Sequence, residues 1–180
     1  MMKHHWVVVM SLACCSALPV HAQDAAPPSV AAGIKMSYNQ IKTNLTKAAD
    51  KMSEEDYSFQ PTKEERNFGG WVAHVADSQM GICSRAAGSP KTIGAGQKTS
   101  KADLVAALKQ SFDACDAVYD TLTDANMAQP VPGFRGSQPL AVALSGNVAH
   151  DTECYGTMAV YLRLKGIVPP STEAMMGRGR

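Results

Sequence analysis

The sequence lacks an excess of charge of either sign. Its 180 residues include 17 lysines and arginines and 16 aspartates and glutamates, which gives a formal net charge of +1 at pH 7. Proteins that bind nucleic acid neutralise phosphate groups with a surplus of basic residues. We therefore expect no nucleic-acid partner.

Several sequence signatures of common sites are also missing. The chain has no glycine-rich phosphate loop, no Gly-x-Ser-x-Gly elbow, no Cys-x-x-Cys pair and no paired motif of a di-iron bundle. These absences argue against the usual nucleotide-binding, serine-hydrolase and dithiol redox sites. The most apolar run, Trp6 to Leu18, has 13 residues, whereas a membrane-spanning helix needs about 17 to 25. We expect no membrane span.

Residues 1–22 have the pattern of a secretory signal peptide. Lys3 precedes the apolar run, and small residues stand at the usual cleavage positions. A cysteine pair inside the run raises the alternative of a lipoprotein, but Leu12 lies one place too close to Cys14 for a lipid-attachment box. We expect a secreted protein, located in the periplasm.

Removal of this leader changes the counts of reactive residues. The leader holds one of the 17 basic residues and none of the 16 acidic ones, so the mature net charge is zero. The remaining histidines are His74 and His150, and the remaining cysteines are Cys83, Cys115 and Cys154. An odd number of cysteines in an oxidising compartment leaves one unpaired thiol or one metal ligand.

Four stretches have apolar residues every three or four positions, and no stretch alternates as a strand would. The predicted helices span residues 29–52, 63–87, 100–122 and 137–165. Ser29 is a plausible N-cap, and Ser100 with Asp103 forms a capping box. A loop rich in proline and glycine is expected at 130–139.

Four helices with one apolar face each are best buried as a four-helix bundle, so we predict an all-α fold. The loop between the second and third helices, residues 88–100, has 13 residues. It can span roughly 43 Å, which exceeds the length of about 33 Å of a 22-residue helix. This length permits, without requiring, a crossover that makes the second and third helices parallel.

The two histidines and Cys154 are candidate metal ligands. His150 and Cys154 are four residues apart, which places both side chains on one face of a helix. His74 on the second helix is the other imidazole of the mature chain. Two imidazoles and a thiolate suit zinc better than magnesium or calcium, and three ligands leave one position open for catalysis. The alternative is that each histidine is a hydrogen-bonded core residue.

Polar residues near the histidines are candidate helpers of such a site. Asp77 and Glu153 each follow a histidine by three residues, and Asp151 follows one directly. Such carboxylates could orient an imidazole or act as a general base on metal-bound water. The alternative is solvated helix surface. Asn147 and Tyr155 are further candidate donors in a pocket.

Cys83 and Cys115 are candidates for a disulfide. If their helices are parallel, their heights differ by roughly 9 Å at about 1.5 Å per residue. Antiparallel helices would separate them much further. We therefore hypothesise a Cys83–Cys115 bond that leaves Cys154 free for metal, and the alternative is that both are small buried apolar residues.

Several segments together resemble the DinB-like (DinB/YfiT) family over residues 35–172. They are Lys51-Met-Ser-Glu-Glu-Asp-Tyr-Ser-Phe-Gln-Pro-Thr62, Phe68-Gly-Gly-Trp-Val-Ala-His-Val-Ala-Asp77, Asn147-Val-Ala-His-Asp-Thr-Glu-Cys-Tyr-Gly156 and Tyr161-Leu-Arg-Leu-Lys-Gly-Ile-Val-Pro-Pro170. The resemblance implies a four-helix bundle in up-down-down-up order with a crossover between helices 2 and 3. On this basis we divide the chain into a signal peptide at 1–22, a flexible stub and start of helix 1 at 23–34, the bundle at 35–172, and a mobile tail at 173–180.

The resemblance also implies a divalent metal, zinc or nickel, held by three histidines. His74 and His150 match two of these positions, and Cys154 stands at the third, where a thiolate can replace an imidazole. Family activities include transferases and isomerases that use low-molecular-weight thiols such as mycothiol or bacillithiol. We expect a metal-dependent hydrolase or thiol transferase acting on a small molecule. The alternative is a non-catalytic exported bundle that binds metal or a small ligand, or forms a homodimer.

Overall fold

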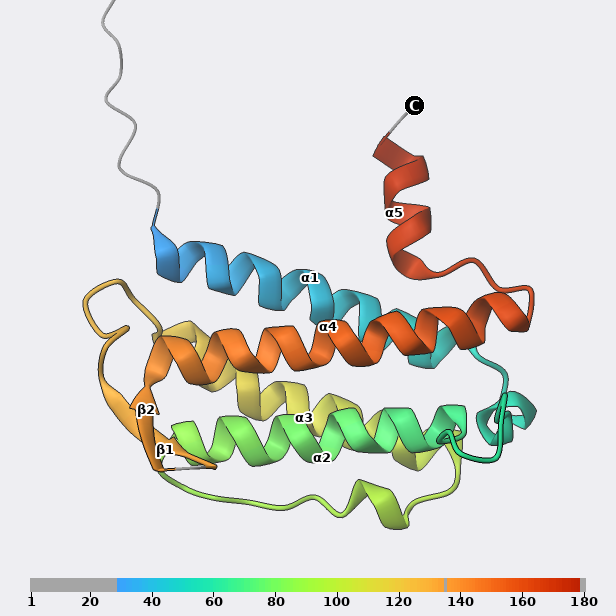
Figure 1. Cartoon of the computed structure of the whole chain (residues 1–180), viewed down its shortest axis with the longest axis horizontal. Helices are drawn as coiled ribbons and strands as arrows, with labels where there is room; N and C mark the ends of the chain where they lie inside the picture. The colour runs from blue at the N-terminus through green and yellow to red at the C-terminus, as the bar shows by residue number, and fades with distance from the viewer. Residues whose placement is uncertain (1–28, 135, 179–180) are drawn as a thin grey trace, which may run out of the picture.

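The computed structural model describes residues 29–134 and 136–178, and within them the molecule is a bundle of four long helices (Figure 1). These are α1 (Val30–Lys51), α2 (Phe68–Ala86), α3 (Lys101–Thr121) and α4 (Leu140–Leu164). The all-helical fold predicted from the periodicity is confirmed. The predicted signal peptide and most of the stub after it lie outside the described residues.

The helices run in two directions. In Figure 1, α1 and α4 run one way and α2 and α3 run the other, and a long connection after α2 crosses the whole bundle. This crossover contains one short 3-10 turn, η2 (Ala95–Gln97). α2 packs most extensively against α3, and α1 against α4. A further 3-10 turn, η1 (Glu55–Ser58), lies between α1 and α2.

Side-chain caps fix where the helices begin. The hydroxyl of Ser29 accepts a hydrogen bond of 3.1 Å from the backbone of Ala32, and Ser100 accepts one of 3.1 Å from Asp103, as the sequence predicted. The prediction for α2 was wrong by five residues. Asn67 caps that helix through a 2.7 Å bond from the backbone of Gly70, so the charged run at 63–66 precedes the helix instead of forming its first turn.

Two segments that were not predicted as regular structure have it. The expected loop at 130–139 contains a hairpin of β1 (Pro130–Gly133) and β2 (Gly136–Pro139), whose prolines are tolerated because a two-stranded ribbon has free edges. This hairpin moves the start of α4 from the predicted position, residue 137, to Leu140. The C-terminal segment forms α5 (Pro170–Arg178), and proline is well suited to the first turn of a helix.

The core lies between the four long helices. The rings of Tyr38 on α1 and Tyr119 on α3 stack with centroids 3.7 Å apart, and Phe68 is fully buried. A disulfide joins Cys83 on α2 to Cys115 on α3, with Cα atoms 5.0 Å apart. This bond fixes the heights of the two parallel helices relative to each other. None of the helices in the described part of the chain is long and apolar enough to cross a membrane.

Candidate metal centre

Three potential metal ligands meet between α2 and α4. The Nε2 atoms of His74 and His150 lie 3.1 Å apart, and the Sγ atom of Cys154 lies 3.6 Å from His150 Nε2. The three donor atoms all lie within 4.8 Å of one another. The structure thus brings together the residues that the sequence singled out as ligands.

Two of the three separations match those around one tetrahedral ion. Zinc bonds of about 2.0–2.1 Å to nitrogen and 2.3 Å to sulfur place neighbouring donor atoms roughly 3.3–3.6 Å apart. The two measured separations, 3.1 and 3.6 Å, are close to that range. Three protein ligands leave a fourth position for water or substrate, as in catalytic zinc sites.

Aromatic packing holds His74 in place on α2. The Trp71 ring lies edge-on to the His74 ring, with centroids 5.8 Å apart. Trp71 donates a 3.2 Å bond to the hydroxyl of Tyr161, which in turn donates a 2.7 Å bond to the backbone of Arg66. Burial and the nearby Arg66 charge lower the pKa of His74, which favours the neutral imidazole that a metal requires.

Asp151 contacts the ring nitrogen of His150 that lies opposite the cluster. Its Oδ1 atom lies 3.3 Å from His150 Nδ1, and its side chain is fully buried. This contact directs the opposite nitrogen, Nε2, toward His74 and Cys154. The hydrogen bond to Asp151, aided by Cys154, raises the pKa of His150 to about 10. A carboxylate behind a ligating histidine is the usual arrangement at metal sites, and it makes the imidazole a stronger ligand.

A buried amide, that of Asn147, lies beside Asp151. The Asn147 side chain donates a 2.9 Å bond to Gln79 Oε1 and lies 3.3 Å from the Tyr119 hydroxyl and 3.5 Å from Asp151 Oδ2. Tyr119 donates a 2.7 Å bond to the backbone of Leu144. The network holds the Asn147 side chain beside Asp151. Gln79 was missed by the sequence analysis, because nothing in its spacing distinguishes it from a surface residue.

The other predicted helpers lie elsewhere. Asp77 accepts bonds of 2.8 and 3.0 Å from the backbone of Ala95 and Gly96, so it anchors the crossover to α2. Glu153 is exposed on the outer side of α4. Tyr155 donates a 2.9 Å bond to Ser171 and thereby attaches α5. Of these three, none is hydrogen-bonded to a ligand histidine among the described residues, and Asp151 takes the role considered for Asp77 and Glu153.

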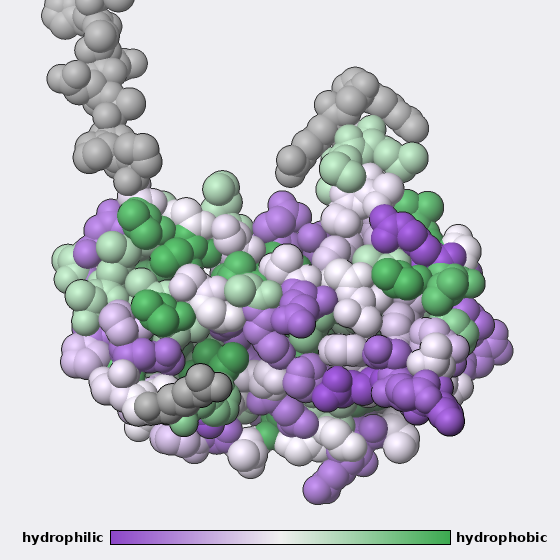
Figure 2. Space-filling model, in the orientation of Figure 1, coloured by the Kyte–Doolittle hydropathy of each residue, from purple (hydrophilic) through white to green (hydrophobic). Residues whose placement is uncertain are grey.

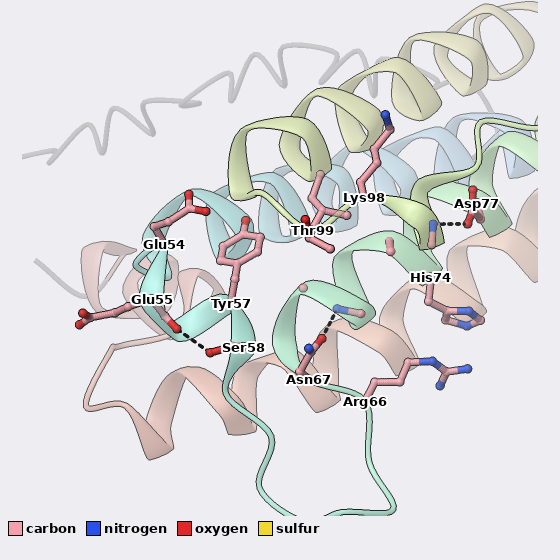
Figure 3. Close-up of a pocket in the computed structure, with 15 residues that line it drawn as sticks. Glu54, Glu55, Tyr57, Ser58, Arg66, Asn67, His74, Asp77, Lys98 and Thr99 are labelled. Carbon is pink, nitrogen blue, oxygen red and sulfur yellow. Dashed lines mark hydrogen bonds between the residues drawn. The ribbon is translucent and has the colours of Figure 1, made fainter.

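Two cavities reach the cluster from different sides. His74 lines a polar groove of about 830 Å³ formed by η1, the start of α2 and the crossover (Figure 3). In Figure 3 the Arg66 side chain extends to the same side of α2 as the His74 ring, and Asp77 faces the crossover. His150 lines a smaller pocket of about 330 Å³ between α2, α4 and the hairpin.

Comparison with known proteins points to one family. The family model described as the DinB superfamily matches residues 38–158. A DinB-like protein from Bacillus cereus ATCC 10987 has a TM-score of 0.66 at 18% identity, and the match covers 79% of this chain and 96% of that one. The DinB-like protein YjoA from Bacillus subtilis has a TM-score of 0.59 at 20% identity, covering 74% and 92%. An uncharacterised protein from Escherichia coli UTI89 has a TM-score of 0.60 at 14% identity, covering 78% and 96%. No curated protein matches the chain.

Proposed function

Because the chain belongs to the DinB superfamily and carries a three-donor cluster at its centre, we propose that it is a metal-dependent enzyme. His74, His150 and Cys154 would hold one zinc ion, with nickel as the alternative metal. The activity we propose is hydrolysis or the transfer of a low-molecular-weight thiol. The observation that carries this proposal is the convergence of two imidazole nitrogens and one sulfur within 4.8 Å.

The donor set fits such chemistry. When bound, the ion would lower the pKa of a coordinated water or thiol, which makes a nucleophile available at neutral pH. Cys154 is buried, and Cys83 and Cys115 are bonded to each other, so it is the free thiol of the described chain. A thiolate ligand favours zinc over magnesium or calcium. Asp151 keeps the His150 ring in the orientation that coordination needs.

The polar groove offers a route for a hydrophilic co-substrate. It borders His74 and is lined by residues of both charges, including Glu54, Arg66 and Lys98 (Figure 3). A low-molecular-weight thiol carries polar and charged groups along its length, and such a molecule suits this lining better than an apolar one does. We propose that the thiol or water enters from this side.

Metal analysis of the purified mature protein tests the proposal. We expect about one equivalent of zinc or nickel in the wild type and almost none in His74→Ala or His150→Ala, whereas Glu153→Gln should keep the metal because its side chain is exposed. A wild type without bound metal, even after incubation with zinc, would contradict the metal site.

Activity measurements then separate catalysis from binding. The loaded protein is assayed with model esters, and with model electrophiles in the presence of bacillithiol or mycothiol. Turnover that disappears in His150→Ala supports an enzyme. Stoichiometric metal without turnover of any substrate in the panel favours an exported bundle that only binds metal. The proposed export, which depends on residues 1–22, is tested by the N-terminal sequence of protein recovered from the periplasm.

A further inference from the structure

The pocket beside His150 is different in character from the polar groove. It runs between α2 and α4 toward the hairpin and has a volume of about 330 Å³. Ile82 on α2, Val142 on α4 and Phe134 on the hairpin give it an apolar lining. Figure 2 shows hydrophobic surface near the N-terminal end of α4, next to the hairpin. Its lining residues include the guanidinium of Arg85 and no carboxylate.

Arg85 lies at the end of this pocket that is farthest from His150. Its guanidinium lies 3.9 Å from the centre of the Phe134 ring, and a Cβ atom at Gly81 would lie only 3.1 Å from Arg85 Nη2. The side chain therefore folds back along α2, over the glycine and toward the metal centre. A larger residue at position 81 would force it away.

The charge of Arg85 has no counter-ion among the described residues. Its Nε atom is buried without a hydrogen-bond partner, and no carboxylate of the described residues forms an ion pair with it. A buried N–H group without a hydrogen-bond partner is costly, and part of this cost is recovered when an anion binds the guanidinium. The planar guanidinium matches a carboxylate, to which it can donate two parallel hydrogen bonds.

The distance between this charge and the metal centre sets the size of the ligand. Gly81, over which the guanidinium lies, is seven residues after His74, which is about 10 Å along the helix axis. Ile82 and Val142 occupy the intervening wall. A ligand that spans the pocket therefore has an anionic group at one end, an apolar middle, and its other end at the metal centre.

We propose that the pocket between α2, α4 and the hairpin binds a medium-chain apolar carboxylic acid, with its carboxylate on Arg85. This inference deepens the proposed function and rests on it in one respect: it names the substrate class as acids whose reactive group lies at the end opposite the carboxylate. The thiol or water enters from the polar groove on the His74 side, and the acid enters from the His150 side.

Calorimetric titration with octanoate and octanamide tests the proposal. The metal-depleted mature protein is used, so that the carboxylate cannot bind an ion instead. We expect octanoate to bind at least tenfold more tightly than octanamide. Arg85→Met should lower the affinity for octanoate at least tenfold and change the affinity for octanamide by less than threefold. Arg163→Met, which removes an exposed arginine from the opposite end of α4, should change neither. Equal octanoate affinity in the wild type and Arg85→Met would overturn the proposal.

A second variant tests the apolar wall without touching the charge. Gly146 lines the pocket, and a Cβ added to it meets no atom within 4 Å, so Gly146→Leu should fold and fill the space. This variant should lower the affinities for octanoate and octanamide alike. Undiminished binding of both would show that these ligands bind outside this pocket. Metal content is measured in every variant. Retained zinc with no octanoate binding contradicts this inference alone, whereas octanoate binding without any metal site contradicts the proposed function.

Discussion

The Nε2 atoms of His74 and His150 lie 3.1 Å apart, although the two residues are 76 positions apart in the sequence. At this distance the two nitrogens either share a proton or bind a common ion. The sulfur of Cys154, 3.6 Å from the same His150 nitrogen, supplies the third donor that the proposed common ion needs. The most direct predictions concern this sulfur.

Cys154→Ser should weaken metal binding at least tenfold, because a hydroxyl is a poorer ligand for zinc than a thiolate. The cobalt-loaded wild type should show a thiolate-to-cobalt charge-transfer band that is lost in Cys154→Ser. Cys154→His, which restores three imidazoles, should keep the metal and also lack this band. An unchanged cobalt spectrum in Cys154→Ser would show that the sulfur is not a ligand.

Asp151→Asn should lower zinc affinity by about 10- to 100-fold, because the charge that orients and strengthens His150 is removed while the shape is kept. The measurement is competition for zinc against a chelating dye, with thermal unfolding of the metal-free variant to confirm that the fold is intact. Glu153→Gln is the matched control, since this neighbouring carboxylate is exposed. Equal losses in both variants would mean that Asp151 has no special role.

Cys83→Ala with Cys115→Ala should lower the free energy of unfolding by about 3–4 kcal/mol, as expected for the entropy of a loop of this size. The cysteines are 32 residues apart and join parallel helices. Urea unfolding of the double variant, compared with the wild type with and without reductant, measures the loss. The reduced wild type should match the double variant, and equal stability of all three samples would show that the bond contributes nothing.

Stability should depend on pH through Asp124. Its Oδ1 atom accepts a 2.8 Å hydrogen bond from the backbone of Ala31 at the start of α1, and this bond lowers the pKa of the carboxyl below its usual value. The stabilisation is therefore fully present above the unfolded pKa of about 3.9. It is lost as the pH falls through the lower, folded pKa.

Asp124→Asn imitates the protonated carboxyl and should lower the melting temperature at pH 7. The difference from the wild type should shrink as the pH falls below about 4. Asp120→Asn, at an exposed position near the end of α3, is the control and should show no such pH-dependent difference. A difference in melting temperature between the wild type and Asp124→Asn that stays constant with pH would show that the Asp124 carboxylate is not the source of the pH dependence.

The parts of the fold that were predicted correctly are those set by local chemistry. Ser29 and Ser100 cap α1 and α3 as expected, because a serine side chain caps a helix without help from the rest of the protein. The start of α2 was misplaced because the charged residues 63–66 have good helix propensity, whereas the cap at Asn67 decides the start. The hairpin was missed because its prolines outweigh any strand pattern, although its buried Val131 packs into the core.

In the candidate site, too, the features set by local spacing were predicted and those that depend on the rest of the fold were not. The spacing of His150 and Cys154 on one helix suffices to place both on one face. The position of Asp77, three residues after His74, does not reveal that it lies on the side of α2 that faces the crossover. Arg85 was missed for a related reason: the role proposed for it depends on a pocket that the hairpin completes, and the hairpin was not predicted.

The Cys83–Cys115 bond closes a covalent ring that includes the whole crossover from α2 to α3. A protease that cuts this connection would therefore leave both fragments in one molecule, still carrying His74 on one side and His150 and Cys154 on the other. The nicked protein would migrate as intact chain on a non-reducing gel and separate into two bands only after reduction.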